Sequence, residues 1–326
     1  MNNYVPKKDA TSLKNVISIS GNGANTGATF YQSREFTVLQ DAYAIQYKDC
    51  TLTDNQSLFM VALISKSISS TFEWTNKAGW EKVKKRCILL PIKNNEIDFD
   101  FMESFIAELE AQRIAELHAY LKVTGLSSYK LTQEEQQIIQ NFDDIKWKEF
   151  NIIDLFKIKN THSILKSQIN PNSGKIPYVT ASENNNSISS FISYDNSMLD
   201  NGNCVFIGGK TLVITYQKND FFSNDSHNLA LYFADKKNRT VENQLFFCSS
   251  LKSALSHKYT WGNSISNKKI KDDTLMLPIN SNNDIDFELM KTLISAIQKL
   301  VIKDVVLYTN KKIKTTKQVL NKDDMN

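Results

Sequence analysis

Lysines cluster at two places in the sequence, and a tryptophan accompanies each cluster. The second half of the chain has Lys258, Lys268, Lys269 and Lys271 around Trp261 and Asn263; the first half has Lys77, Lys84 and Lys85 after Trp74. Ammonium groups in such clusters neutralise phosphates, while nearby aromatic and amide side chains can contact bases. Most lysine runs are only solvated surface charge. The recurrence at matching places in both halves favours contact with DNA.

A second candidate DNA-contacting group lies within residues 210–227. Its members are Lys210, Tyr216, Gln217, Lys218 and His227. A glutamine amide can pair with adenine in the major groove, and a lysine can reach the acceptors of guanine. Tyr216 fits a packed aromatic side chain equally well, and His227 could contact a base or merely close a strand. These structural alternatives stay open beside the predicted DNA contact.

The sequence contains no group of residues that would catalyse a reaction. The adenine-methylating motif, Asn or Asp followed by two prolines and an aromatic residue, is absent. Gly21, Gly23 and Gly27 precede a strand-like run, whereas a phosphate-binding glycine loop needs a helix N-terminus there. The four histidines, His118, His162, His227 and His257, have no metal-ligand spacing. We predict a non-catalytic protein without cofactor or metal.

The bulk composition is that of an ordinary globular protein. The 326 residues are 41% hydrophobic and 23% charged, which suggests about two domains. A net charge of +4 is too small to indicate a nucleic-acid partner, so any such site must come from local clustering. The four cysteines are far apart, which fits a reducing cytoplasm. The first ten residues lack the apolar run of a signal peptide, and no run is long enough for a membrane span, so we predict a cytoplasmic protein.

An internal repeat organises the chain. The matching segments, separated by roughly 185 residues, are Thr29–Gln32 with Ile214–Gln217, Asp41–Ile45 with Asp225–Leu229, Phe72–Trp74 with Tyr259–Trp261, Leu89–Ile92 with Met276–Ile279, and Ile97–Phe99 with Ile285–Phe287. A period this long indicates a duplicated domain rather than a repeat array. The second copy has roughly 60 residues ahead of its matched block, whereas the first has only residues 1–14. The first unit is therefore expected to lack its front portion.

The residue patterns predict an α+β fold, in which each unit is a β-rich body followed by a long helix. Apolar and β-branched runs at 15–19, 204–207, 212–216 and 229–233 predict strands. Apolar residues then recur at helical spacing, at Met102, Phe105, Ile106 and Leu109 in the first copy and at Met290, Leu293, Ile294 and Ile297 in the second. Asp98 or Asp100 is expected to cap the first helix. Since a long apolar stripe must be covered, we predict that the helices pair as an antiparallel, coiled-coil-like spacer.

The order of several short motifs resembles the specificity subunits of type I and related restriction–modification systems. The motifs are Trp147–Phe150, Asp154–Phe156, Ile176–Ala181 with Asn184–Asn186, Tyr216–Gln217, Tyr259–Trp261, Leu277–Ile279 and Ile285–Phe287. The resemblance implies target-recognition domains that each read half of a split sequence in double-stranded DNA. It also implies helices that separate these domains and dock methyltransferase subunits. A restriction subunit, self-association or a second half-subunit are further expected partners.

The resemblance sets the expected domain boundaries. These are 1–97 for a partial first target-recognition domain, 98–146 for a helical spacer, 147–285 for a complete second target-recognition domain and 286–326 for a C-terminal helix. The missing front of the first unit supports an alternative function, that of a degenerate half-subunit which assembles with methyltransferase without reading DNA. The complete second unit favours the DNA-reading function.

Overall fold

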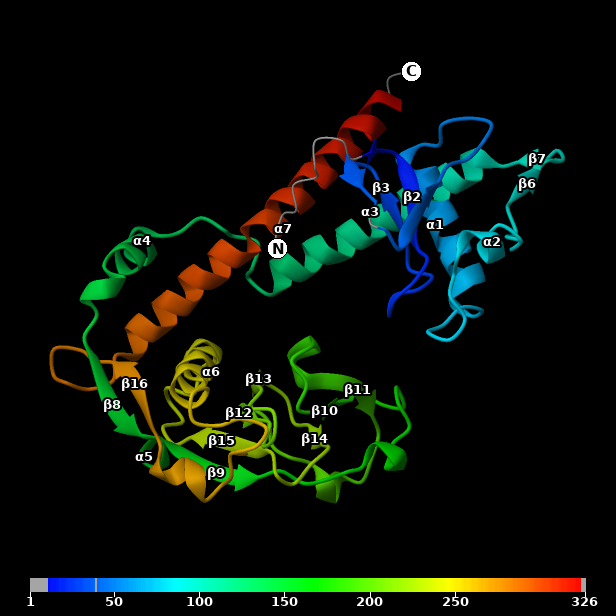
Figure 1. The fold of residues 1–326 in the computed structure, drawn as a ribbon. Coiled ribbons are helices and arrows are strands. Elements are labelled where there is room, and N and C mark those ends of the chain that lie inside the picture. The colour runs from blue at the N-terminus through cyan, green and yellow to red at the C-terminus, as the bar shows by residue number, and fades with distance from the viewer. Residues whose placement is uncertain (1–10, 39, 324–326) are drawn as a thin grey trace. The chain divides into compact units, whose positions relative to one another are not determined.

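The computed structural model describes residues 11–38 and 40–323. The chain divides into two compact units (Figure 1): unit 1 comprises residues 1–124 and 307–326, and unit 2 comprises residues 125–306. Residues 1–10, where no signal peptide is expected, and the last three residues of the expected C-terminal helix lie outside the described residues. Unit 1 is thus formed from two stretches of chain, between which unit 2 is inserted.

Unit 1 is built on a three-stranded antiparallel sheet covered by a helix. Its elements are β1 (Ser12–Leu13), β2 (Val16–Ser20), β3 (Thr29–Gln32), β4 (Phe36–Thr37), β5 (Ala42–Ile45), α1 (Asp54–Ser69), α2 (Trp80–Val83), β6 (Ile92–Lys93), β7 (Glu96–Ile97) and α3 (Phe99–Val123). The sheet order is β3-β2-β5. Ile17 and Ile19 of β2 form a buried cluster with Ile64 and Ile68 of α1.

Unit 2 contains a four-stranded sheet in the order β13-β12-β15-β9 and a smaller sheet in the order β11-β10-β14, while β16 pairs with β8. Its elements are α4 (Gln133–Gln140), η1 (Phe142–Asp144), β8 (Trp147–Asn151), α5 (Ile152–Leu155), β9 (Phe156–Asn160), η2 (Lys166–Gln168), β10 (Ile176–Val179), η3 (Asn185–Ser187), β11 (Ile188–Ile192), η4 (Asn196–Met198), β12 (Cys204–Ile207), β13 (Ile214–Gln217), β14 (Phe222–Ser223), β15 (Leu229–Phe233), α6 (Val241–Leu255), η5 (Lys269–Asp272), β16 (Thr274–Pro278) and the start of α7 (Phe287–Asp323).

The two units share one sheet topology, which confirms the predicted duplication. Strand β2 pairs antiparallel with β3 and β5, just as β12 pairs antiparallel with β13 and β15. The sheet of unit 2 has one further strand, β9, which pairs with β15. The predicted runs at 204–207 and 229–233 coincide with β12 and β15.

The strand register corrects one of the sequence matches. Ile17 and Val205 occupy the same position, since each pairs with the matching tyrosine of the next strand. On their other side, Ile17 pairs with Ile45 and Val205 pairs with Leu231. Ile45 therefore corresponds to Leu231, not to Leu229, and the sequence match was shifted by two residues. A shift of two keeps side chains on the same face of a strand, so the apolar pattern alone could not detect it.

Each unit also contains a helix that the sequence analysis did not predict. These helices, α1 and α6, lie between the sheet and the tryptophan-containing segment. Helix α1 begins with a capping box, in which the Thr53 side chain accepts from the Gln56 N–H and the Gln56 side chain accepts from the Thr53 N–H. That Thr-x-x-Gln spacing was a readable start signal. The β-rich body predicted for each unit is therefore a sheet packed against a helix.

The two long helices begin in the same way. The side chain of Asp98 accepts from the Phe101 N–H at 2.9 Å, and the side chain of Asp286 accepts from the Leu289 N–H at 2.9 Å. Of the two expected caps for α3, Asp98 is the one observed. One helical turn later, Met102 and Met290 are both fully buried in the core of their own unit.

The packing of these helices corrects the expected seam. Leu293 and Ile294 belong to the core of unit 2 and do not form a seam with α3. Phe105 and Leu109 of α3 are exposed. Helix α3 instead contacts the part of α7 that belongs to unit 1, where Glu110 accepts from Tyr308 at 3.2 Å and pairs with Lys312 at 2.7 Å. These two segments run in opposite directions in Figure 1. A spacer role for the helices remains a prediction.

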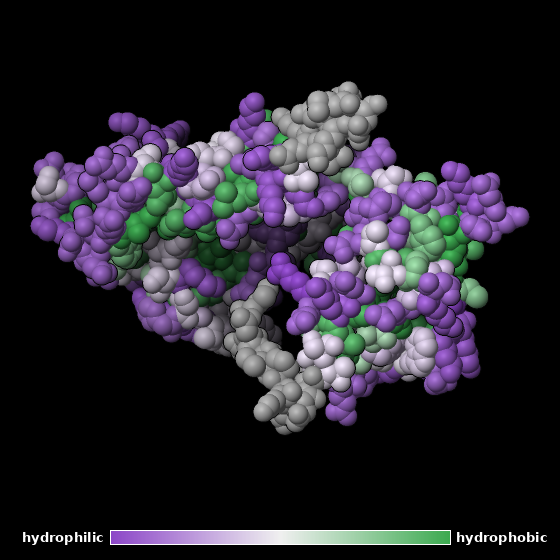
Figure 2. Space-filling model, turned by 90° about the horizontal axis from the view of Figure 1, so that it is seen from above, coloured by the Kyte–Doolittle hydropathy of each residue, from purple (hydrophilic) through white to green (hydrophobic). Residues whose placement is uncertain are grey.

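One face of the molecule shows mainly polar residues (Figure 2). Hydrophilic residues cover most of the face in Figure 2, and hydrophobic residues gather in smaller patches. Among the described residues, no helix combines the length and apolar character needed to cross a membrane.

Candidate nucleic-acid interface

In unit 2 a tight turn presents Trp261 to solvent. An isolated bridge pairs Thr260 with Asn263, and the tryptophan between them is 82% exposed. The amide of Asn263 holds the turn from both sides: its nitrogen donates to the Lys258 carbonyl at 2.9 Å, and its oxygen accepts from the Lys269 ammonium at 2.8 Å. Asn263 and Lys269, both predicted to contact DNA, therefore also shape the turn.

A buried carboxylate anchors the base of this turn. Asp273 accepts from the Tyr259 hydroxyl at 2.6 Å and from the Lys258 ammonium at 3.0 Å. Burial, together with the hydrogen bond to Asp273, raises the pKa of Tyr259 above its ordinary value. Lys258 is thus partly committed to an ion pair. Asp273 has no spacing signal in the sequence, and the sequence analysis missed it.

The short helix η5, together with its N-cap residue Lys268, carries three of the predicted lysines. Ile270 of this helix is fully buried in the core of unit 2. Its neighbours Lys268, Lys269 and Lys271 are exposed. The core contact therefore holds in place the backbone that carries these three lysines.

Unit 1 repeats this arrangement. An isolated bridge pairs Glu73 with Asn76, and Trp74 between them is 66% exposed. The Lys82 ammonium donates to the Asn76 side chain at 2.8 Å, as Lys269 does to Asn263. The buried Val83 of α2 takes the place of Ile270. Lys82 lies between Lys77 and Lys84 in the sequence, but the sequence does not indicate that it closes the turn.

The other predicted lysines of unit 1 surround its turn. The Lys77 ammonium lies 3.6 Å from the centre of the Trp74 ring, which is a cation–π contact. Lys84 pairs with Glu81 at 2.5 Å, and Lys85 is exposed. We call the Trp74 turn with α2, and the Trp261 turn with η5, the tryptophan turns.

In the second candidate group, Lys210 and His227 share one carboxylate. The Asp225 side chain accepts from the Lys210 ammonium at 3.0 Å and lies 2.8 Å from His227 Nδ1. Partial burial opposes ionisation of Asp225, but the hydrogen bonds from His227 and Lys210 outweigh it and lower the pKa to about 2. Gly209 permits this loop to pack, since a Cβ there would lie 2.2 Å from the His227 carbonyl oxygen. The structure therefore brings Lys210 and His227 together.

Tyr216 and Gln217 are not available to DNA. Gln217 is 2% exposed, and its amide nitrogen donates to the Asn186 carbonyl and to the Thr215 hydroxyl. Tyr216 is buried, and its hydroxyl donates to the Asn203 side chain. The packed-aromatic alternative for Tyr216 is correct, and Gln217 is not retained as a base contact. Lys210 precedes β13, whereas Lys218 is exposed directly after its last residue. The two lysines therefore lie at opposite ends of the strand, and the predicted patch is split.

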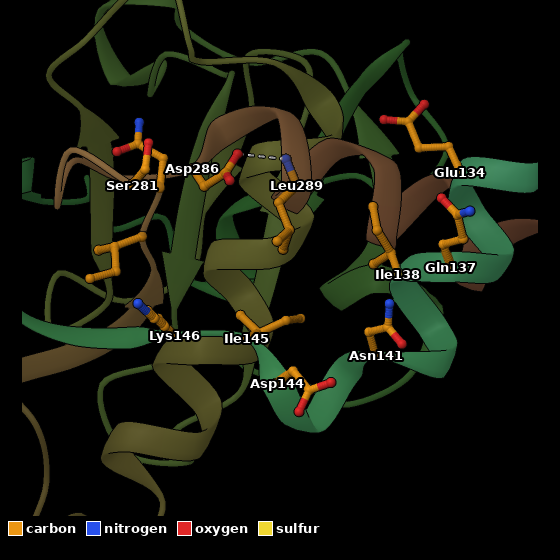
Figure 3. A pocket seen from close by; sticks show the side chains of 12 residues that line it. Glu134, Gln137, Ile138, Asn141, Asp144, Ile145, Lys146, Ser281, Asp286 and Leu289 are labelled. Carbon is orange, nitrogen blue, oxygen red and sulfur yellow. Dashed lines mark hydrogen bonds between the residues drawn. The ribbon is translucent and has the colours of Figure 1, made fainter.

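A surface pocket of about 610 Å³ lies in unit 2 between α4, η1 and the start of α7 (Figure 3). Its lining includes Glu134, Asp144 and Asp286, and Asp286 is the cap of α7. Within residues 11–38 and 40–323, no three His, Cys, Asp or Glu side chains are grouped so as to hold a metal ion. One of the three carboxylates that line the pocket is therefore already engaged as a helix cap.

Comparison with known proteins places these features in a family. Residues 1–119 and 144–318 match the model of the type I restriction modification DNA specificity domain. A curated relative is the specificity subunit S.BcgI of a type II restriction enzyme from Heyndrickxia coagulans, which is 23% identical over 259 residues, 77% of this chain and 69% of the relative.

Two solved structures with similarity to this chain are also specificity subunits. The S subunit of a type I restriction–modification system from M. genitalium matches 96% of this chain and 83% of its own, with a TM-score of 0.48 and 14% identity. The HsdS subunit from Thermoanaerobacter tengcongensis matches 94% of this chain and 78% of its own, with a TM-score of 0.36 and 10% identity. On the extent of the family match, the chain belongs to the type I restriction modification DNA specificity domain family.

Proposed function

We propose that this chain is the non-catalytic subunit that recognises DNA in a restriction–modification complex, and that the tryptophan turns contact the duplex. The observation that carries the proposal is the recurrence of one device in both units: an exposed tryptophan, an asparagine bonded to a lysine, and a short lysine-bearing helix. Lysines held beside the phosphate backbone position a protein, while aromatic and amide groups can reach bases. Lys210 and His227 add a second polar contact in unit 2.

We further propose that residues 1–97 and 147–285 are the two target-recognition domains and that α3 and α7 serve as the spacer. Exposed apolar residues on these helices offer docking surfaces for methyltransferase. On α3 these are Phe101, Phe105 and Leu109, and on α7 they are Ile297, Val301 and Val305. In both sets the residues recur every four positions and therefore share a helix face.

The experiment that tests DNA recognition is a salt titration of duplex binding. We expect the full chain to bind duplex DNA with an affinity that falls as salt rises, because phosphate contacts release counterions. Lys268→Ala with Lys271→Ala should reduce the slope by close to one unit for each phosphate that the variant no longer neutralises, and should weaken binding to all sequences alike.

The control for this titration is Lys148→Ala with Lys146→Ala, which removes the same charge from unit 2 away from the turn. An equal reduction of the slope in both double variants would contradict a specific role for the turn. Assembly with methyltransferase without any DNA binding would instead favour the alternative of an interaction protein.

A non-catalytic role predicts that the isolated chain binds no S-adenosylmethionine. The methyl donor needs a glycine-rich loop before a helix or a methyltransferase motif. The glycines at 21, 23 and 27 precede a strand, and the adenine-methylating motif is absent. Isothermal titration calorimetry with the purified chain checks this. Stoichiometric binding would contradict the proposal.

A further inference from the structure

The outer edge of β5 in unit 1 is open where the matching edge of unit 2 is paired. Strand β15 pairs with β12 on one side and with β9 on the other. Strand β5 pairs with β2 and with no other strand among the described residues. Unpaired amides and carbonyls at a sheet edge are a template for an added strand. The sister unit shows what this kind of sheet accepts, namely an antiparallel strand such as Phe156–Asn160.

A second segment of unit 1 lacks its partner in the same way. Residues 87–91 correspond to β16, because the same hydrogen bond follows each segment. The Asp98 N–H donates to the Pro91 carbonyl at 2.9 Å, and the Asp286 N–H donates to the Pro278 carbonyl at 2.9 Å. Strand β16 pairs with β8. Residues 87–91 form no strand, and Leu89 is 91% exposed.

One continuous segment fills both of these places in unit 2. Strand β8 leads through the single turn of α5 directly into β9, so Trp147–Asn160 supplies the partner of β16 and the partner of β15 together. The two gaps in unit 1 therefore belong to one docking site for one strand–helix–strand segment.

Backbone hydrogen bonds show which groups of β5 face the open edge. The Gly21 N–H donates to the Asp41 carbonyl at 2.8 Å, beside the first residue pair of β2 and β5. Bonded and non-bonded pairs alternate along an antiparallel ladder. The N–H and C=O groups of Ala42 and Ala44 consequently point away from β2, toward the open edge.

The same reasoning gives the register of the incoming strand. In unit 2 the Ala234 N–H donates to the Leu155 carbonyl and the Thr161 N–H donates to that of Asn228. By alternation, Ala230 and Lys159 exchange hydrogen bonds, since they face each other in the register. Ala230 corresponds to Ala44, because they pair with matching residues of β12 and β2.

We propose that unit 1 binds a strand–helix–strand segment of the type Trp147–Thr161 along the open edge of β5 and against residues 87–91. The incoming strand runs antiparallel to β5, with the residue equivalent to Lys159 opposite Ala44. The site goes beyond DNA recognition and does not depend on it.

The test uses the full chain and a fluorescently labelled synthetic peptide with the sequence of Trp147–Thr161. Fluorescence anisotropy should show saturable binding. N-methylation of the Lys159 amide removes a donor that faces β5, whereas N-methylation of the Ile158 amide alters the opposite side of the strand. We expect the first peptide to bind roughly threefold to tenfold more weakly, as when one hydrogen bond is removed, and the second to bind nearly normally.

A protein variant distinguishes peptide binding at β5 from a peptide that replaces β9 beside β15 in unit 2. Ala44→Pro removes an amide that faces the edge, and proline is tolerated on edge strands at such positions. The variant should melt like the parent and lose peptide binding. Unchanged binding, or equal effects of the two N-methyl groups, would overturn the proposal.

Hydrogen exchange keeps the proposal testable if the Ala44→Pro variant fails to fold. Bound peptide should slow amide exchange at 42–46 of the unmodified chain and leave exchange at 229–233 unchanged. Protection confined to 229–233 would show strand exchange in unit 2 and would equally overturn the proposal.

Discussion

Single side chains in the tryptophan turns combine a structural role with the DNA-contacting role that we propose for these turns. Asn263 and Asn76 each use their amide to close a turn, and Lys269 and Lys82 serve as the bonded partners. A lysine bonded in this way loses less conformational freedom when it meets a phosphate than one on an unrestrained stem. The tryptophan turns therefore present cations that are already placed.

Asp225 allows a test of the Lys210–His227 group by pH. Its pKa in the folded chain is lowered from 3.8 to about 2, so the ionised carboxylate stabilises the fold above about pH 4. That contribution disappears as the pH falls through about 2. We expect Asp225→Asn to lower the free energy of unfolding at pH 7 by about 1 kcal/mol, and urea unfolding at pH 7 and pH 3 checks this. An equal deficit at both pH values would indicate a defect unrelated to ionisation.

At the scale of elements, one buried ion pair attaches α4 to α7 within unit 2. Glu135 accepts from Lys299 at 2.7 Å and from the Ser295 hydroxyl at 2.7 Å, and the carboxylate is nearly inaccessible. Desolvation opposes ionisation, but hydrogen bonds from Lys299, Thr132 and Ser295 outweigh it and lower the pKa to about 2.

Removing one partner of this pair leaves a buried charge without compensation. We expect Lys299→Met to cost about 3–5 kcal/mol of stability in unit 2. Adding Glu135→Gln should recover part of the loss, because the neutral amide no longer needs a cation. Chemical denaturation of the two single variants and the double variant gives the coupling energy. Additive losses would mean that the two side chains do not interact energetically.

The sequence predicted those elements whose pattern is local and missed those that depend on partners. Strands β12 and β15 were predicted because each is a short apolar run with β-branched or aromatic residues and a turn-forming residue at its start. Gln217 was misplaced because the sequence does not show that Asn186 lies beside it to accept its amide hydrogen bond. Leu293 was assigned to a helix–helix seam because an apolar stripe on a helix does not indicate which surface packs against it. Asp273 was missed because its partners Lys258 and Tyr259 become neighbours only after folding.

At the scale of the whole molecule, α7 belongs to both units. Its residues to Val306 are part of unit 2, and those from Leu307 onward are part of unit 1. Leu293 is buried in the core of unit 2, while Ile313 lines an apolar groove of unit 1 with Ile114 and Ala111 of α3.

Two matched variants separate these roles of α7. Leu293→Asp puts a charge into the unit 2 core, where loss of the leucine alone costs about 2–5 kcal/mol. It should raise amide hydrogen exchange in β12 and β15 and leave β2 protected. Ile313→Asp should do the reverse. Hydrogen-exchange mass spectrometry measures both, and matching exchange patterns in the two variants would show that the units unfold as one.

The insertion of unit 2 within unit 1 has a consequence for the order of synthesis. On the ribosome, α3 emerges before any of unit 2, yet the segment of α7 that lies against it emerges only after unit 2 has been made. A chain interrupted anywhere before Leu307 leaves Ile114 and its neighbours on α3 without that cover. In such a product, this apolar surface of α3 would be accessible to quality-control proteases, whereas α7 covers it in the full chain. Incomplete chains would therefore be degraded faster than complete ones.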